Sequence, residues 1–121
     1  MLFDTSILVD FMRGRTEAVS LVKSAKSGAG LSVVTVAELF AGAKRHTEER
    51  EIRELVAELK VIVVSQTIAE LAGNHVKHFA ASHSLELPDA LIAATAQQHG
   101  LALATLNVKH FPMFKRLRPA Y

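Results

Sequence analysis

The chain alternates short apolar runs with longer segments of helical spacing, and this alternation is the sequence feature that most restricts its fold. Apolar runs at 2–3, 31–34, 61–64 and 101–105 have the length of strands. Strands separated by helices predict a parallel sheet with helices on both faces, which is an α/β fold. The predicted helices span residues 7–12, 16–27, 35–46, 47–60, 65–84 and 89–99.

Local signals refine these boundaries. The run 61–64 is unbroken and β-branched, which predicts a strand buried on both faces. Pro88 fits the first turn of the last long helix, and Gly100 fits its end. Residues 107–114 are predicted as a loop or short turn, and the end of the chain as a small edge strand.

Length and composition bound the class of protein. The 121 residues predict a single domain over 1–121, and 50% hydrophobic residues suffice for one core. The absence of cysteine excludes a disulfide framework, a thiol nucleophile and cysteine-ligated zinc, and it suits a reducing compartment. No apolar run approaches the ~18 residues of a membrane span, and no secretory signal opens the chain. We therefore expect a cytoplasmic protein without a membrane anchor.

The formal charge of +2 does not by itself indicate a nucleic-acid binder, but the charges are unevenly spread. Five of the twelve acids lie between residues 48 and 58, as on a solvated helix face. Residues 109–121 contain lysine, arginine and histidine but no acid. Such a tail is compatible with phosphate contacts and equally with ordinary surface charge.

Three acids stand outside the solvated faces, and each has a purely structural explanation. Asp4 follows the first strand and can cap the next helix. Glu38 lies three residues after Thr35, which is the spacing of a capping box. Asp89 follows Pro88 in a first helical turn, where negative charge suits the helix dipole.

Taken together, the same three acids suggest a metal site. Each adjoins an apolar segment, so its carboxylate would be partly desolvated, which is costly without a nearby cation. A hard divalent ion such as Mg²⁺ accepts a few carboxylates and keeps several waters. The histidines offer no rival zinc site, because the helical pair His75 and His78 lacks an evident third ligand. No Ser-His-Asp arrangement is evident either, so Ser6 is predicted to support the helix start or Asp4.

Four motifs in order resemble those of PIN-domain ribonucleases, and the chain is similar to VapC-type toxins of bacterial or archaeal toxin–antitoxin pairs. The resemblance extends over residues 1–114, nearly the whole chain. The motifs are Asp4-Thr5-Ser6, Thr35-x-x-Glu38-Leu39, Leu87-Pro88-Asp89-Ala90-Leu91-Ile92-Ala93-Ala94 and Ala104-Thr105-Leu106-Asn107.

The resemblance implies a three-layer sandwich with a small central parallel sheet flanked by helices. It implies metal-dependent endonucleolytic cleavage of RNA, with Mg²⁺ or Mn²⁺ in an acidic pocket. Asp4 and Asp89 match the family's metal-binding aspartates, and Glu38 matches the glutamate of the same pocket, placed to orient or deprotonate a water. The family pattern also implies a VapB-type antitoxin in a groove beside the site and a homodimer.

One departure concerns the number of metal ions. Many relatives have an aspartate where this chain has Asn107, which adds a ligand oxygen but no negative charge. We therefore expect one firmly held ion, with Asn107, Thr105 and Ser6 positioning groups around it. Basic residues must line the approach of RNA to this acidic pocket. The candidates are Arg13, Arg15, Lys109 and Lys115.

Two other functions remain compatible with the sequence. One is a PIN-like domain that only binds RNA or a protein, and the other is a metal-dependent DNA nuclease. The apolar residues of the first two predicted helices likewise have two explanations, an antitoxin groove or ordinary core. These residues are Ile7, Leu8, Phe11, Met12, Val19, Leu21 and Val22.

Overall fold

The computed structural model describes residues 1–25 and 28–121, in which four short strands form one parallel sheet. The strand order is β3 (Lys60–Ile62), β2 (Gly30–Ser32), β1 (Leu2–Phe3) and β4 (Leu103–Ala104). All pairings are parallel, so the carboxyl ends of the strands meet at one edge. The helices are α1 (Thr5–Met12), α2 (Thr16–Ser24), α3 (Val33–Gly42), α4 (His46–Glu58), α5 (Gln66–His83), α6 (Leu87–Gln98) and a 3₁₀ helix at Val108–His110.

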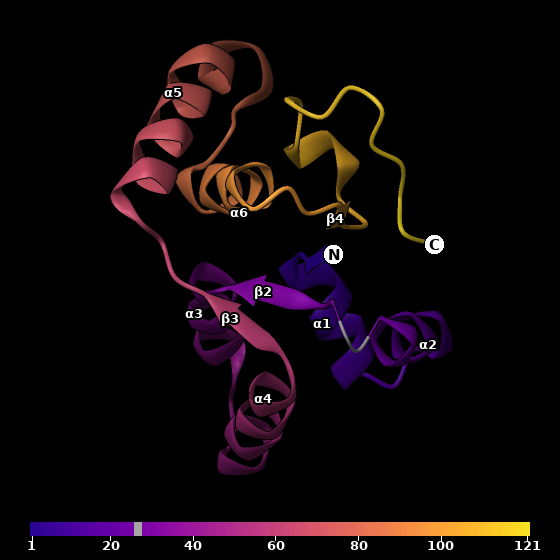
Figure 1. The fold of residues 1–121 in the computed structure, drawn as a ribbon. Coiled ribbons are helices and arrows are strands. Elements are labelled where there is room, and N and C mark those ends of the chain that lie inside the picture. The colour runs from indigo at the N-terminus through magenta and orange to yellow at the C-terminus, as the bar shows by residue number, and fades with distance from the viewer. Residues whose placement is uncertain (26–27) are drawn as a thin grey trace.

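Alternating side chains of the sheet build two cores, one on each face. Phe3 and Leu31 pack with residues of α1 to α4 on one face. Leu2 and Ile62 pack with α6 and with Phe111 on the other face. Figure 1 shows the same layering, with α1 to α4 on one side of the strands and α5, α6 and the C-terminal segment on the other. The predicted three-layer α/β sandwich is confirmed.

The apolar residues of the first two helices contribute mainly to the first core. Ile7, Leu8 and Val22 are buried in it, so the core explanation is correct for these three. Phe11 and Met12 are half-buried against the same core. Leu21 is also half-buried against it, and Val19 is half-buried.

The junction between β2 and α3 differs from the prediction. The strand ends at Ser32, and the helix begins two residues before Thr35. Ser32 is the N-cap, because its hydroxyl accepts a hydrogen bond from the Val34 N–H at 3.1 Å. The Thr35–Glu38 capping box is therefore wrong: Thr35 is a buried residue within the helix. Both side chains are available for contacts elsewhere.

The strand predicted at 61–64 is shorter and lies at the edge of the sheet. β3 ends at Ile62, and Val61 and Val63 are 36% and 68% exposed. The prediction of burial on both faces is wrong, because β3 has a strand neighbour on one side only. β-branched composition favours extended backbone but does not distinguish an edge strand from a central one.

Other boundaries shift by a few residues. α4 begins at His46 and ends at Glu58, and the last strand shortens to Leu103–Ala104. α2 ends at Ser24, while 26–27 at the end of the predicted helix lie outside the described residues. The described residues 111–121 form no edge strand; Ala120 instead donates a backbone hydrogen bond to Thr105. No helix in the described part of the chain combines the length and apolarity needed to cross a membrane.

Candidate active site

The carboxyl edge of the sheet gathers the acids that the sequence singled out. Asp4 directly follows β1, and its N–H donates to the Ala104 carbonyl of the neighbouring β4 at 2.9 Å. Glu38 lies on α3, which starts directly after β2. Asp89 lies in the first turn of α6, the helix that packs on the sheet through Leu2 and Ile62. Three separate elements therefore contribute one acid each.

Asp4 is held by two hydroxyl groups and does not cap α1. It occupies the N-cap position but its side chain makes no capping hydrogen bond. Ser6 Oγ and Thr105 Oγ1 both donate to Asp4 Oδ2, at 2.9 and 2.8 Å. Asp4 is only 4% exposed, and these two bonds to Oδ2 leave Oδ1 available for another partner. The capping explanation is wrong for Asp4.

The two hydroxyls are themselves fixed by the loop after β4. Ser6 Oγ accepts from the Leu106 N–H at 3.2 Å, and Thr105 Oγ1 accepts from the Asn107 N–H at 2.9 Å. Each hydroxyl donates its one proton to the carboxylate and accepts from backbone, which fixes its orientation. Asp4 is thus oriented by residues about a hundred positions away. Ser6 and Thr105 therefore both contact the Asp4 carboxylate directly.

Glu38 is oriented by a threonine pair that the sequence did not reveal. Thr5 Oγ1 lies 2.7 Å from Glu38 Oε1 and 3.1 Å from Thr35 Oγ1. An ionised carboxylate can only accept, so Thr5 donates to Glu38 and accepts from Thr35. Thr35 is buried, whereas Glu38 is exposed. The two threonines therefore hold one oxygen of a carboxylate whose side chain reaches solvent. Thr5 therefore supports Glu38, while Ser6 supports Asp4.

The pKa of Asp89 reflects its burial and the charges around it. The pKa of Asp89 is raised from its ordinary 3.8 to about 6, mainly by burial and to a lesser extent by the charges of Asp4 and Glu38. His110 opposes this shift, with its Nδ1 3.4 Å from Asp89 Oδ2. Asp89 is therefore partly desolvated and lies within the electrostatic influence of Asp4 and Glu38. The helix-dipole explanation alone would lower the pKa, so it does not account for Asp89.

His110 is a member of the site that sequence reasoning missed. Its side chain is 57% exposed, and its ring nitrogen Nδ1 lies 3.4 Å from Asp89 Oδ2. The available signal was its place in the basic stretch that starts two residues after Asn107. Asn107 itself has an exposed side chain, and its backbone N–H binds Thr105.

The donor set suits a hard cation that keeps several waters. Within the described residues, no three acidic or histidine side chains are close enough together to enclose a metal ion. Two carboxylates suffice for Mg²⁺, which fills its remaining positions with water and substrate oxygens. Asp4, with Oδ1 available, and Asp89, with a pKa raised mainly by burial, have the chemistry required of such a pair. The residues therefore fit a divalent ion.

We expect Thr105→Val to lower the free energy of unfolding by about 2 kcal/mol, measured by chemical denaturation, because the Asn107 N–H and Asp4 lose a buried partner. Thr95→Val is the matched control. Thr95 is equally buried, but its hydroxyl bonds only the Leu91 carbonyl of its own helix, so the cost should stay below about 1 kcal/mol. Equal losses in the two variants would contradict a special role for the Thr105 hydroxyl.

Comparison with known proteins agrees with this architecture. The family model described as "PIN domain" matches residues 1–117. The chain is 42% identical to Ribonuclease VapC10 of Mycobacterium tuberculosis, covering 100% of this chain and 92% of the relative. It is 36% identical to Ribonuclease VapC19 of the same organism, covering 99% and 98%.

The fold resembles that of a chain in a toxin–antitoxin complex from Klebsiella pneumoniae, with a TM-score of 0.84 and 36% identity. That match covers 99% of this chain and 97% of the other. The three comparisons agree on the family: the family model matches nearly the whole chain, two relatives exceed 30% identity, and the fold is shared. The chain therefore belongs to the PIN domain family, among the ribonucleases of the VapC type.

Proposed function

We propose that this chain is a metal-dependent endoribonuclease, the toxin of a VapBC-type toxin–antitoxin pair, and that residues 1–121 form a single PIN domain. The observation that carries the proposal is the placement of Asp4 and Glu38 directly after neighbouring strands, with Asp89 near enough for their charges to add to the burial that raises its pKa. Carboxylates that are partly buried near one another suit a divalent ion and a bound phosphate. The relatives' name, ribonuclease, supports RNA as the substrate.

Asp4 and Asp89 are the proposed metal ligands, with Mg²⁺ or Mn²⁺ as the ion. Ribonucleases of this family generally depend on a divalent metal. When bound, such an ion lowers the pKa of water and offsets negative charge on the phosphate. Ser6 and Thr105 hold Asp4 through Oδ2, which leaves Oδ1 available for the ion. Asn107 supplies an uncharged oxygen beside them, which supports one firmly held ion.

Glu38 is the proposed base. Thr5 holds its Oε1, so Oε2 is free to orient a water and to take its proton. The water oxygen bonds to phosphorus while the phosphorus–oxygen bond to the leaving ribose breaks, and the leaving oxygen gains a proton from solvent. One water is consumed for each phosphodiester cleaved.

The partners follow from the same comparisons. A structure of 36% identity is titled as a toxin–antitoxin complex, which supports a VapB-type antitoxin as the cognate partner. We also propose that the chain acts in the cytoplasm, where RNA is available. A homodimer stays a prediction.

Cleavage assays on matched RNA and DNA oligonucleotides, with Mg²⁺, Mn²⁺ or excess EDTA, test the proposal. We expect cutting of RNA with metal and none with EDTA. Cutting of DNA in preference to RNA would replace the proposal with a DNA nuclease. Absence of cutting together with RNA binding would replace it with a non-catalytic domain.

A metal titration gives a readout that needs no substrate. At pH 7.5, Mn²⁺ at about 100 times its dissociation constant should raise the free energy of unfolding by about 2.7 kcal/mol. The gain should fall as the pH drops below about 6, because Asp89 then takes up a proton in the folded state. Calorimetry at pH 5 and 7.5 measures it, with Asp89→Asn as control. Equal metal stabilisation of the control would contradict Asp89 as a ligand.

A further inference from the structure

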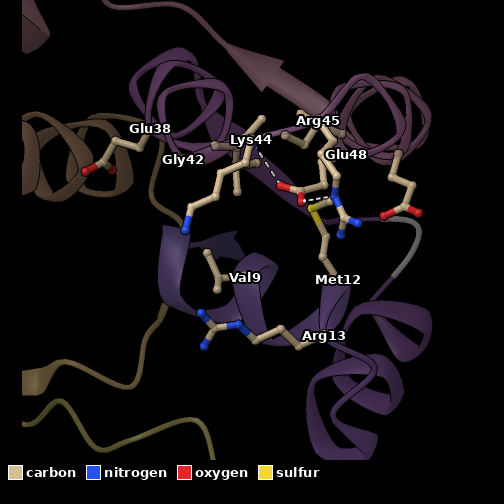
Figure 2. Close-up of a pocket in the computed structure, with 12 residues that line it drawn as sticks. Val9, Met12, Arg13, Glu38, Gly42, Lys44, Arg45 and Glu48 are labelled. Atoms are coloured by element: carbon tan, nitrogen blue, oxygen red, sulfur yellow. Dashed lines mark hydrogen bonds and ion pairs between the residues drawn. The ribbon is translucent and has the colours of Figure 1, made fainter.

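A groove of about 540 Å³ opens beside the acidic site, between α1, α3 and α4 (Figure 2). Glu38 lines one end of it, so the groove and the site share a residue. Val9 and Met12 of α1 form part of the opposite wall. Its lining residues are Val9, Met12, Arg13, Glu38, Leu39, Gly42, Ala43, Lys44, Arg45, Glu48, Glu51 and Ile52.

The cations of the groove differ in what they contact. Arg45 Nε is 3.1 Å from Glu48 Oε1, so its charge is already paired. In the described part of the chain, the side chains of Arg13 and Lys44 form no ion pair, and both residues are exposed. Figure 2 shows the Lys44 ammonium and the Arg13 guanidinium extending into the groove from opposite walls, on either side of Val9. Two positive charges that form no ion pair in the described residues thus lie in the groove that Glu38 lines.

Arg15, predicted beside Arg13 as an approach cation, has other partners. Its guanidinium is 3.7 Å from Asp10 Oδ2 and 3.6 Å from Glu17 Oε1, and it lies over the Tyr121 ring. Arg15 is therefore engaged with its own surroundings, while Lys44, which the sequence did not single out, lines the groove.

We propose that Arg13 and Lys44 bind the phosphates that neighbour the cleaved one, so that single-stranded RNA enters the site through this end of the groove. The proposal rests on the proposed function and adds to it a substrate path. An acidic site repels a polyanion, and two unpaired cations next to Glu38 offset that repulsion. Guanidinium and ammonium groups are the usual phosphate partners in proteins.

Charge also limits where RNA can lie. The side of the groove formed by α4 carries Glu48 and Glu51; Glu48 is paired with Arg45, so Glu51 is the charge that disfavours phosphate there. RNA is therefore placed across the end between Glu38 and Val9, and does not follow the groove along its full length. A groove enclosed by three helices suits an unpaired strand, the form of RNA that proteins most often recognise.

Steady-state cleavage of a labelled single-stranded RNA tests the pair, using Arg13→Gln, Lys44→Gln and the double variant at several salt concentrations. We expect KM to rise roughly fivefold per substitution with kcat almost unchanged, because the contacted phosphates do not react. The slope of log(1/KM) against log salt should lose about 0.7 for each side chain removed.

Two matched controls separate this role from general charge. Arg45→Gln removes a paired cation of the same groove, and Lys23→Gln removes an exposed cation on α2. Both should leave KM within about twofold of the parent value. Thermal unfolding of every variant confirms that the fold is retained.

The outcomes distinguish this proposal from the proposed function. A parent protein that cleaves RNA, with KM and salt slope unchanged in the double variant, overturns the phosphate contacts alone. A parent protein that neither binds nor cleaves RNA overturns both proposals. Unchanged KM for RNA together with weakened binding of the antitoxin would assign the two cations to a protein partner.

Discussion

Asp4→Asn is expected to lower kcat/KM for RNA cleavage by on the order of 1000-fold while leaving the fold intact. The substitution keeps size and shape, and an amide oxygen can still accept from the Ser6 and Thr105 hydroxyls. Only the negative charge is lost. Without that charge the proposed metal ligand weakens, and several kcal/mol of transition-state stabilisation are removed. Single-turnover cleavage with saturating Mn²⁺ measures the effect.

Asp10→Asn is the matched control for this experiment. Asp10 lies on α1, the helix that follows Asp4, and its Oδ2 accepts from the Tyr121 hydroxyl at 2.7 Å and lies 3.7 Å from Arg15 Nη1. The control should lose stability and retain cleavage, because Asp10 belongs to a structural cluster away from the other acids. Activity of Asp4→Asn within tenfold of the parent protein would reject Asp4 as a metal ligand.

Asp89→Asn should show opposite effects on activity and on stability. We expect cleavage to fall by a similar factor, while the metal-free protein at pH 8 gains about 1–2 kcal/mol in its free energy of unfolding. In the unfolded chain Asp89 ionises near 3.8, and in the folded protein near 6. Asparagine resembles the protonated carboxyl that the folded protein prefers, so the variant avoids the cost of an unpaired charge.

The sign of the pH dependence follows from those two values. Between pH 3.8 and 6 the folded state holds the proton more tightly, so stability falls as the pH rises through this window. Above pH 6 the loss is complete, and the gap between the two pKa values sets a ceiling of about 3 kcal/mol. Partial exposure of Asp89, at 23%, and solvent screening reduce that ceiling to the expected 1–2 kcal/mol.

Urea denaturation of the metal-free protein at pH 4 and pH 8 measures the gain. The advantage of Asp89→Asn should be present at pH 8 and nearly absent at pH 4. Glu86→Gln is the control, because Glu86 is exposed and lies just before α6, and its effect should stay within about 0.5 kcal/mol. A variant less stable than the parent protein at pH 8 would mean that the Asp89 charge is stabilising without metal.

The antitoxin surface was predicted too broadly from the sequence. Apolar helical spacing marked Ile7, Leu8 and Val22 as possible docking residues, and all three are buried. Periodicity identifies the apolar side of a helix, but it does not tell how much of that side the sheet already covers. The groove forms where α4 packs beside α3 and α1, and this packing depends on the whole chain.

The layered parallel fold and the three acids could be predicted from the amino-acid sequence. Apolar runs separated by segments of helical spacing are local patterns, so they can be recognised without the structure. Carboxylates next to apolar segments can be recognised in the same way. The ends of the strands were predicted less accurately. Capping by Ser32 and the edge position of β3 depend on neighbours in space, which the sequence does not show.

The contacts of each acid depend on the tertiary fold and could not be predicted from the sequence. The Thr105 hydroxyl reaches Asp4 across 101 positions because β4 pairs with β1, and no local pattern records that pairing. The contact of Thr5 with Glu38 depends in the same way on β1 lying beside β2. The chemistry of a side chain is known from the residue type alone. The register of a sheet, in contrast, depends on the packing of the complete core. The acids were therefore predictable, and their supporting hydroxyls and His110 were not.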